Sequence, residues 1–136
     1  MEPVRLLLVE DNPGDVRLIQ HVLEGYPRPI TMEVAANDDE ALQKLSLAAR
    51  EADLVLVDLS IPGVCSGGFF ERLSSRKVAW VVFSSTVDPK ERDSLVARGA
   101  REYIQKPSDL SAFALAVFDI LDRWAPGGSD RVSGTC

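Results

Sequence analysis

Carboxylate, hydroxyl and amine side chains follow four separate stretches of this chain that are typical of strands. Glu10 and Asp11 come after the first stretch, Asp58 after a later one, Ser84 after the next and Lys106 after the last. If these stretches are strands of one parallel sheet, the side chains meet at the edge where the strands end, which is where open α/β sheets bind ligands. Carboxylates held close together raise each other's proton affinity unless a cation binds them. An all-oxygen cluster suits Mg²⁺, and without a nearby His or Cys it does not suit zinc.

The chemistry that this set of residues favours is phosphoryl transfer to Asp58. A carboxylate beside Mg²⁺, a Lys and a Ser can attack phosphorus while the cations neutralise charge on the phosphoryl oxygens. Each residue also has a simpler interpretation. Asp58 could be a strand terminator or helix N-cap, Glu10 and Asp11 a capping pair, Ser84 a strand-end hydroxyl and Lys106 a solvated lysine. Their occurrence together, after successive strands, favours the chemical interpretation.

The elements that must position these residues alternate along the chain. Apolar or alternating stretches predict strands over residues 4–9, 30–35, 53–57, 78–83 and 102–105. Helical spacing predicts helices over about 16–24, 38–50, 69–73, 89–98 and 110–124. This alternation predicts a doubly wound α/β fold, with a five-stranded parallel sheet and helices on both faces.

Length and composition favour one domain, which we place at residues 1–124. The chain has 136 residues, of which 46% are hydrophobic and 26% charged, as in ordinary globular proteins. Residues 125–136 are rich in Gly and Ser, and we expect a disordered tail there. Two cysteines, Cys65 and Cys136, give neither a disulfide framework nor a zinc pattern.

Charge and hydropathy exclude several classes of partner. The net charge of −6 and the scattered Lys and Arg do not favour binding to nucleic acid. The early apolar run, residues 6–9, is too short for a membrane span or a signal peptide and is followed at once by acidic residues. We therefore expect a cytoplasmic protein that does not contact membranes.

In its order of motifs the chain resembles the receiver domain of two-component response regulators, over residues of about 4 to 124. The residues that carry the resemblance are Glu10-Asp11, Asp58 with Pro62 four positions on, Ser84, Gly99-Ala100, Tyr103 and Lys106-Pro107. More loosely, the stretches 9–15 and 106–108 are similar to the single-domain regulators that partner bacterial phytochromes. The resemblance implies a flavodoxin-like sheet with strand order 2-1-3-4-5.

The resemblance also implies roles for residues around Asp58. Asp58 would be the phosphoacceptor, taking a phosphoryl group from a sensor histidine kinase. Asp11 and Asp58, with the backbone carbonyl of Ser60, would coordinate Mg²⁺, and Glu10 would act through a bound water. Lys106 would pair with the phosphoryl oxygens, and its bond to Pro107 would be cis.

The resemblance also implies residues that would transmit the effect of phosphorylation or set the lifetime of the phosphoryl group. Ser84 would move to hydrogen-bond the phosphoryl group, and Tyr103 would rotate inward to fill the vacated space. Ser60 and Thr86 would tune the lifetime of the phosphoryl group. Two features depart from the family: Ser66 stands where a Gly is usual, and the stretch from Asp58 to Ser84 is short. We therefore expect an abbreviated or irregular third helix within residues 63–77.

The function expected is that of a stand-alone receiver that signals by binding and is not a turnover enzyme. Leu115 and Phe118 lie away from the core stripe of the last predicted helix and suggest homodimerisation or docking of a downstream protein. An alternative is an adaptor on the same fold that acts without phosphorylation. A Mg²⁺-dependent phosphohydrolase with an aspartyl-phosphate intermediate is disfavoured, because it needs a D-x-D pair, where this chain has Glu10-Asp11-Asn12, and a substrate cap.

Overall fold

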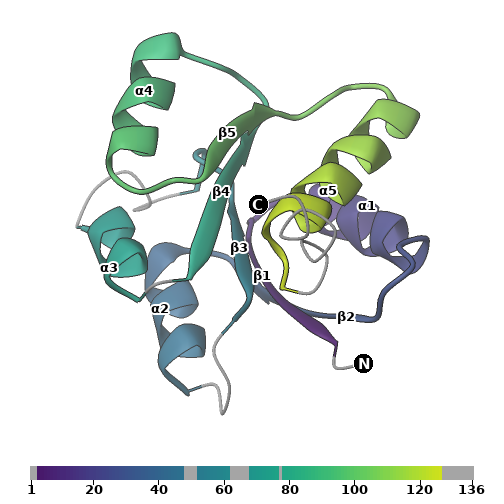
Figure 1. Ribbon diagram of the computed structural model, residues 1–136, viewed down its shortest axis with the longest axis horizontal. Coiled ribbons are helices and arrows are strands. Elements are labelled where there is room, and N and C mark those ends of the chain that lie inside the picture. The colour runs from purple at the N-terminus through teal and green to yellow at the C-terminus, as the bar shows by residue number, and fades with distance from the viewer. Residues whose placement is uncertain (1–2, 48–51, 62–67, 77, 127–136) are drawn as a thin grey trace, which may run out of the picture.

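A computed structural model describes residues 3–47, 52–61, 68–76 and 78–126 of the chain. Strands and helices alternate along it (Figure 1). In chain order they are β1 (Val4–Val9), α1 (Pro13–Glu24), β2 (Ile30–Ala35), α2 (Asp38–Leu47), β3 (Leu54–Val57), α3 (Phe69–Ser75), β4 (Ala79–Ser84), α4 (Pro89–Ala97), β5 (Glu102–Gln105) and α5 (Leu110–Trp124). The strands form one parallel sheet of order β2-β1-β3-β4-β5, which confirms the predicted fold.

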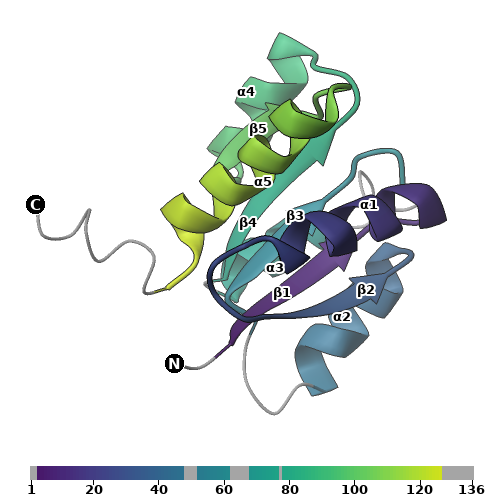
Figure 2. The ribbon, with the colours of Figure 1, turned by 90° about the vertical axis from the view of Figure 1, so that its right-hand side faces the viewer.

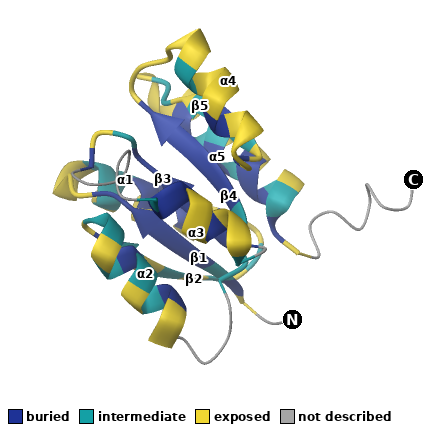
Figure 3. Cartoon of the chain, turned by 90° about the vertical axis from the view of Figure 1, so that its left-hand side faces the viewer, coloured by how far each residue is buried: buried dark blue, intermediate teal, exposed yellow. Residues whose placement is uncertain are grey.

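Three layers result, with α1 and α5 on one face of the sheet and α2, α3 and α4 on the other (Figures 1 and 2). Each face has its own apolar core, because alternate side chains of a strand point to opposite faces. Figure 3 shows the central strands fully buried beneath helices whose outer surfaces are exposed. This double burial explains why β1, β3 and β4 read as nearly continuous apolar runs.

The third strand is the most deeply buried element and carries Asp58 at its end. All four of its residues have no exposed surface; Leu54 and Leu56 join the core beneath α1 and α5, and Val55 and Val57 the opposite core. The backbone N–H of Asp58 donates to Val9 O at 3.0 Å. The ladder therefore continues one residue beyond the strand and fixes the backbone of Asp58.

Helix α1 begins at Pro13, three residues earlier than the predicted start at Val16. Asn12 is the N-cap, and its Oδ1 accepts hydrogen bonds from the backbone N–H groups of Gly14 at 2.8 Å and Asp15 at 3.2 Å. Pro13 takes the first helical position, where its missing N–H is no loss. The acidic side chain of Asp15 therefore belongs to the first turn of a helix and not to a loop.

The region expected to be abbreviated does contain a short helix. Helix α3 has seven residues, and its Phe70 stacks on Trp80 with ring centroids 4.9 Å apart. Pro62, Cys65 and Ser66 lie outside the described residues, as do residues 48–50, into which the second predicted helix extended, and 127–136 of the predicted tail. Ala125 is buried, and its N–H donates to Leu121 O, so the prediction that the disordered tail begins at this residue is wrong.

Two further observations concern the described ranges. They contain no cis peptide bond, so the expected cis bond between Lys106 and Pro107 is wrong; trans is the more stable form even before proline. None of the helices in these ranges is long and apolar enough to cross a membrane.

The turn between α4 and β5 generates a test of the fold. Gly99 has φ of +121°, and a Cβ atom there would collide with Ser74 Oγ and lie 3.2 Å from Ser74 Cβ. Ser74 Oγ donates to Arg98 O at 2.7 Å and accepts from Trp80 Nε1 at 3.3 Å. We expect Gly99→Ala to lower the free energy of unfolding by about 2 kcal/mol, measured by urea denaturation.

The matched control for this substitution is Gly25→Ala. Gly25 ends α1 with φ of −88°, and a Cβ atom there would be 3.5 Å from its nearest neighbour, Val22 O. This variant should cost much less than Gly99→Ala. Equal stability of the two variants would show that the strain at Gly99 is not real.

Candidate functional site

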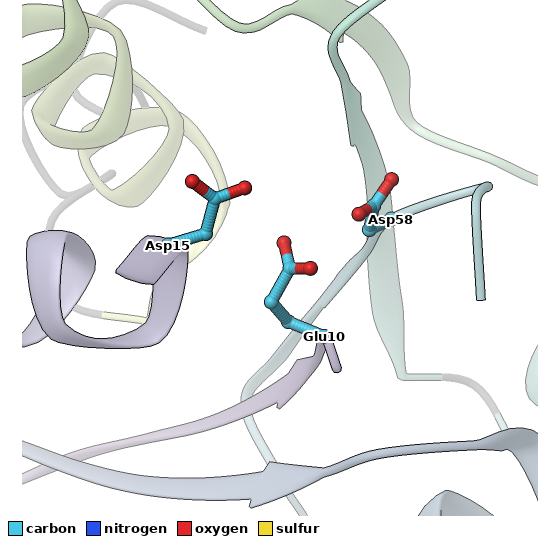
Figure 4. A group of neighbouring side chains, drawn as sticks. All are labelled: Glu10, Asp15 and Asp58. Carbon is cyan, nitrogen blue, oxygen red and sulfur yellow. The ribbon is translucent and has the colours of Figure 1, made fainter. Parts of the chain in front are cut away.

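The polar residues predicted to meet at the sheet edge come together in the structure. Glu10 follows β1, Asp58 follows β3, Ser84 ends β4 and Lys106 follows β5. Glu10, Asp58 and Ser84 are the buried polar residues of the described chain, at 1%, 6% and 5% exposure. Figure 4 shows the carboxylate of Glu10 between those of Asp58 and a residue not predicted, Asp15 of α1.

The ammonium group of Lys106 links these carboxylates. Its Nζ lies 2.7 Å from Glu10 Oε1, 2.9 Å from Asp15 Oδ2 and 3.6 Å from Asp58 Oδ2, and its side chain is 7% exposed. The first two distances are those of charge-assisted hydrogen bonds, and the third is too long for one. Three acidic side chains thus surround one cation, and the third contact is a charge interaction alone.

Asp58 is held by its own turn as well. Its Oδ1 accepts a hydrogen bond from the backbone N–H of Ser60 at 3.1 Å, and its Oδ2 accepts one from the Ser60 hydroxyl at 2.8 Å. A carboxylate with two such donors is held in one orientation. Ser60 therefore touches the predicted phosphoacceptor directly, which is a position from which it can affect reactions of that carboxylate.

The close packing of these acids changes their proton affinities in opposite directions. Burial, with the proximity of Asp58, raises the pKa of Glu10 to about 7 even though Lys106 opposes the shift. Burial would also raise the pKa of Asp58, but hydrogen bonds from protonated Glu10 and from Ser60, together with the charge of Lys106, bring it below its ordinary value. The pair therefore favours one proton on Glu10 and a charged Asp58.

The same contacts keep Lys106 protonated. Burial alone would lower the pKa of its ammonium group, but the hydrogen bonds to Glu10 and Asp15 and the charge of Asp58 together raise it. A permanent positive charge thus lies beside the ionised carboxylate of Asp58. Such an arrangement can bind an anionic group that approaches Asp58, as phosphoryl transfer requires.

The acidic cluster differs in one member from the predicted one. One carboxylate oxygen each from Glu10, Asp15 and Asp58 lies within 4.8 Å of the others. Asp11 is exposed and is not part of this group, so its role as a metal ligand stays a prediction. Asp15 was missed because its position depends on where α1 begins; the Asn12-Pro13 cap signal, taken as a helix start, would have placed it in the first turn.

The predicted switch residues Ser84 and Tyr103 lie on the paired strands β4 and β5. The hydroxyl of Ser84 accepts a hydrogen bond from Thr86 N at 3.4 Å. Tyr103 is buried, and its hydroxyl lies 3.0 Å from both Thr86 O and Glu91 Oε1, the acceptors to which it can donate. Burial and the carboxylate of Glu91 raise the pKa of the Tyr103 hydroxyl. The ring is thus already inside the protein, held by the loop after β4 and by α4.

The two residues of the predicted partner face have different surroundings. Leu115 on α5 is 62% exposed. Phe118 is only partly exposed, because its ring packs against Tyr26 with centroids 5.2 Å apart. The hydroxyl of Tyr26 in turn donates to Asp122 Oδ1 at 2.6 Å. Phe118 therefore contributes to packing between α5 and the loop after α1, a role that its place in the sequence does not predict.

Comparisons with known proteins agree with this geometry. The chain matches the family model described as "Response regulator receiver domain" over residues 6–118. It is 34% identical over 109 residues to the transcriptional activator protein PfeR of Pseudomonas aeruginosa, a match covering 79% of this chain and 34% of that relative. It is 28% identical over 134 residues to the transcriptional regulatory protein GlrR of Escherichia coli, covering 96% and 29%. The chain thus spans about a third of the length of these relatives.

Solved structures of single receiver domains match nearly the whole fold. The phosphorylated cyanobacterial phytochrome response regulator RcpA is 26% identical, with a TM-score of 0.79 over 90% of this chain and 94% of that one. A response regulator from Hahella chejuensis is 26% identical, with a TM-score of 0.77 over 91% and 96%. The first agrees with the looser resemblance to regulators that partner phytochromes.

The raised proton affinity of Glu10 generates a test by pH. Without Mg²⁺, the folded chain binds a proton at Glu10 with a pKa of about 7, against the ordinary value of 4.5. Between these values the folded state holds the proton more tightly than the unfolded state does. The native chain therefore loses stability as pH rises through this window, by at most about 3 kcal/mol.

Glu10→Gln removes the titrating group, so the variant does not lose this part of its stability. We therefore expect the free energy of unfolding of the variant to rise relative to that of the native chain as pH rises. Chemical denaturation at about pH 5 and about pH 8 in chelator-treated buffer measures it. Glu24→Gln, which removes an exposed carboxylate, is the control for loss of one acidic side chain. A difference that stays constant, or shifts toward the native chain, would contradict this account of Glu10.

Proposed function

Since the chain belongs to the response regulator receiver domain family, we propose that it is a cytoplasmic phosphoacceptor that takes a phosphoryl group on Asp58 from a sensor histidine kinase. The observation that carries this proposal is the buried Asp58 carboxylate after β3, which lies 3.6 Å from the ammonium group of Lys106 after β5 at the same edge of the sheet. One structurally similar response regulator, RcpA, was itself solved in a phosphorylated form. Signalling would follow from altered binding and not from turnover of a substrate.

The transfer step needs one nucleophile and one leaving group. A carboxylate oxygen of Asp58 forms a bond to phosphorus while the bond from phosphorus to the donor breaks, and the donor leaves with the electron pair. From acetyl phosphate the leaving group is acetate; from a phosphohistidine it is the imidazole nitrogen, which takes up a proton. Lys106 stays protonated throughout and neutralises charge on the phosphoryl oxygens.

The donor set at the site fits Mg²⁺. Receiver domains bind this ion through acidic residues, and the described cluster offers carboxylate oxygens alone. We propose that Asp58, Asp11 and the backbone carbonyl of Ser60 hold the ion, with Glu10 acting through water. When bound, Mg²⁺ supplies positive charge that offsets repulsion among the acids and between them and the phosphoryl group.

Ser84, Tyr103 and Thr86 would couple the phosphoryl group to the surface. Ser84 would hydrogen-bond a phosphoryl oxygen, and its movement would change the contacts of the loop that carries Thr86. Because the Tyr103 hydroxyl lies 3.0 Å from Thr86 O, movement of that loop changes what Tyr103 contacts. Ser60 and Thr86, next to the phosphoacceptor and the switch hydroxyl, would set the lifetime of the phosphoryl group.

The proposal is tested by labelling. With Mg²⁺ and acetyl phosphate, the native chain should gain the mass of one phosphoryl group, the label should be lost at alkaline pH, and chelation should prevent it. Asp58→Asn should not be labelled, whereas Asp93→Asn, which removes an exposed carboxylate of α4, should be labelled as the native chain is. Intact mass spectrometry measures all three chains.

Failure of the native chain to become labelled by either acetyl phosphate or a phosphorylated histidine kinase would overturn the proposal. The adaptor on the same fold, acting without phosphorylation, would then be the function to test. Label on the Asp58→Asn chain would show that another residue is the phosphoacceptor.

We also propose that the outer face of α5 mediates homodimerisation or binding of a downstream protein. Leu115 carries the proposal, because it is a large apolar side chain left 62% exposed. Leu115→Ser should weaken dimerisation of the labelled chain several-fold, as loss of a central apolar contact does. Leu47→Ser on α2, where the side chain is 84% exposed, is the matched control and should not. Sedimentation at several concentrations measures both, and equal behaviour of the two variants would exclude dimerisation through this face.

A further inference from the structure

We propose that Asp15 is a positioning residue for Lys106, holding its ammonium group so that one N–H bond is directed at the phosphoryl group on Asp58. This inference rests on the proposed function and adds a residue to it. Asp15 lies on α1, outside the strand ends that supply Glu10, Asp58 and Lys106. Its Oδ2 is 2.9 Å from Lys106 Nζ.

The ammonium group of Lys106 has one N–H bond more than it has acceptors at hydrogen-bonding distance. An ammonium group has three, and two of them have acceptors at hydrogen-bonding distance, Glu10 Oε1 at 2.7 Å and Asp15 Oδ2 at 2.9 Å. Asp58 Oδ2, at 3.6 Å, is the remaining acidic neighbour. Two fixed hydrogen bonds thus orient the group and leave one N–H free for an oxygen of the phosphoryl group that Asp58 accepts.

Asp15 lies on the side of Lys106 that faces solvent. The lysine side chain is flexible, and its ammonium is strongly hydrated, so it turns toward water unless it is held. Asp15 and Lys106 both line an open groove, together with Ser85, Gln105 and Pro107. Asp15 is one-third exposed, whereas Glu10 is buried. Asp15 is therefore the acceptor on the solvent side of the ammonium group, where it opposes movement of Lys106 into the groove.

If Asp15 only stabilised its helix, its effect would not depend on Lys106. An acidic residue in the first turn of any helix interacts favourably with the helix dipole, and Asp39 does so in α2. Asp39→Asn is therefore a matched control, because it removes the same charge from the same kind of position away from the site. What distinguishes Asp15 is that its effect should depend on Lys106.

The experiment is a double-mutant cycle on the full chain. We expect Asp15→Asn to slow labelling of Asp58 by acetyl phosphate about tenfold at saturating Mg²⁺, the size expected for loss of one hydrogen bond that orients a charged group. In the Lys106→Met background, Asp15→Asn should have no further effect. Asp39→Asn should label at the native rate, and the Mg²⁺ concentration that gives half-maximal labelling should be the same with and without Asp15.

A second measurement does not depend on labelling. Reductive methylation with formaldehyde and a borane, followed by peptide mass spectrometry, reports how accessible each lysine is. Lys106 should be methylated several-fold faster in Asp15→Asn than in the native chain, while the exposed Lys90 serves as the internal reference. This measurement decides the question if the Lys106→Met chains label too slowly to compare.

The outcomes separate the inference from the proposed function. If the native chain is not labelled, the proposed function is overturned. If Lys106 is nevertheless methylated faster in Asp15→Asn, the ion pair between Asp15 and Lys106 is still supported. A native chain that is labelled, with Asp15→Asn labelled equally fast or Lys106 methylated no faster, overturns the inference. If Asp15→Asn raises the Mg²⁺ concentration needed for half-maximal labelling, both with Lys106 present and in the Lys106→Met chain, then Asp15 is a metal ligand. That result also overturns the inference.

Discussion

One buried cation determines how this site can be built. Lys106 is almost fully enclosed, and a lysine in that position costs free energy unless acids accept its hydrogen bonds. Glu10 and Asp15 do so, and Asp58 stands just beyond reach. The acids in turn would repel one another without Lys106. Cation and carboxylates therefore stabilise each other, and loss of Lys106 would leave the charge of the buried Asp58 carboxylate without its neighbouring cation.

The sheet makes this arrangement possible. Parallel strands end at one edge, so residues nearly a hundred positions apart in sequence, Glu10 and Lys106, meet without any long loop. The double burial of β3 keeps Asp58 from shifting along its strand, since a slip of one residue would exchange its apolar side chains between the two cores. The rigid packing of the sheet thus serves the position of a single carboxylate.

The sequence predicted the residues whose place depends on strands alone. Glu10, Asp58 and Lys106 could be assigned because each directly follows a stretch that the sequence predicts to be a strand. Asp15 could not, because its place depends on the first turn of a helix, and a shift of three residues in that start turns its side chain elsewhere. The same limit applies to Phe118, since its contact with Tyr26 depends on how two helices pack.

The contact of Glu91 could not be predicted from the sequence for a different reason, and this contact has a consequence for Tyr103. In sequence it looks like the third residue of a capping box, yet its carboxylate lies by the hydroxyl of Tyr103. The resting chain thus already holds the ring inside with a side-chain acceptor and a backbone acceptor. Under the proposed function, phosphorylation of Asp58 would therefore not have to bring the Tyr103 ring inward; it would act on a buried ring whose hydroxyl already has two acceptors.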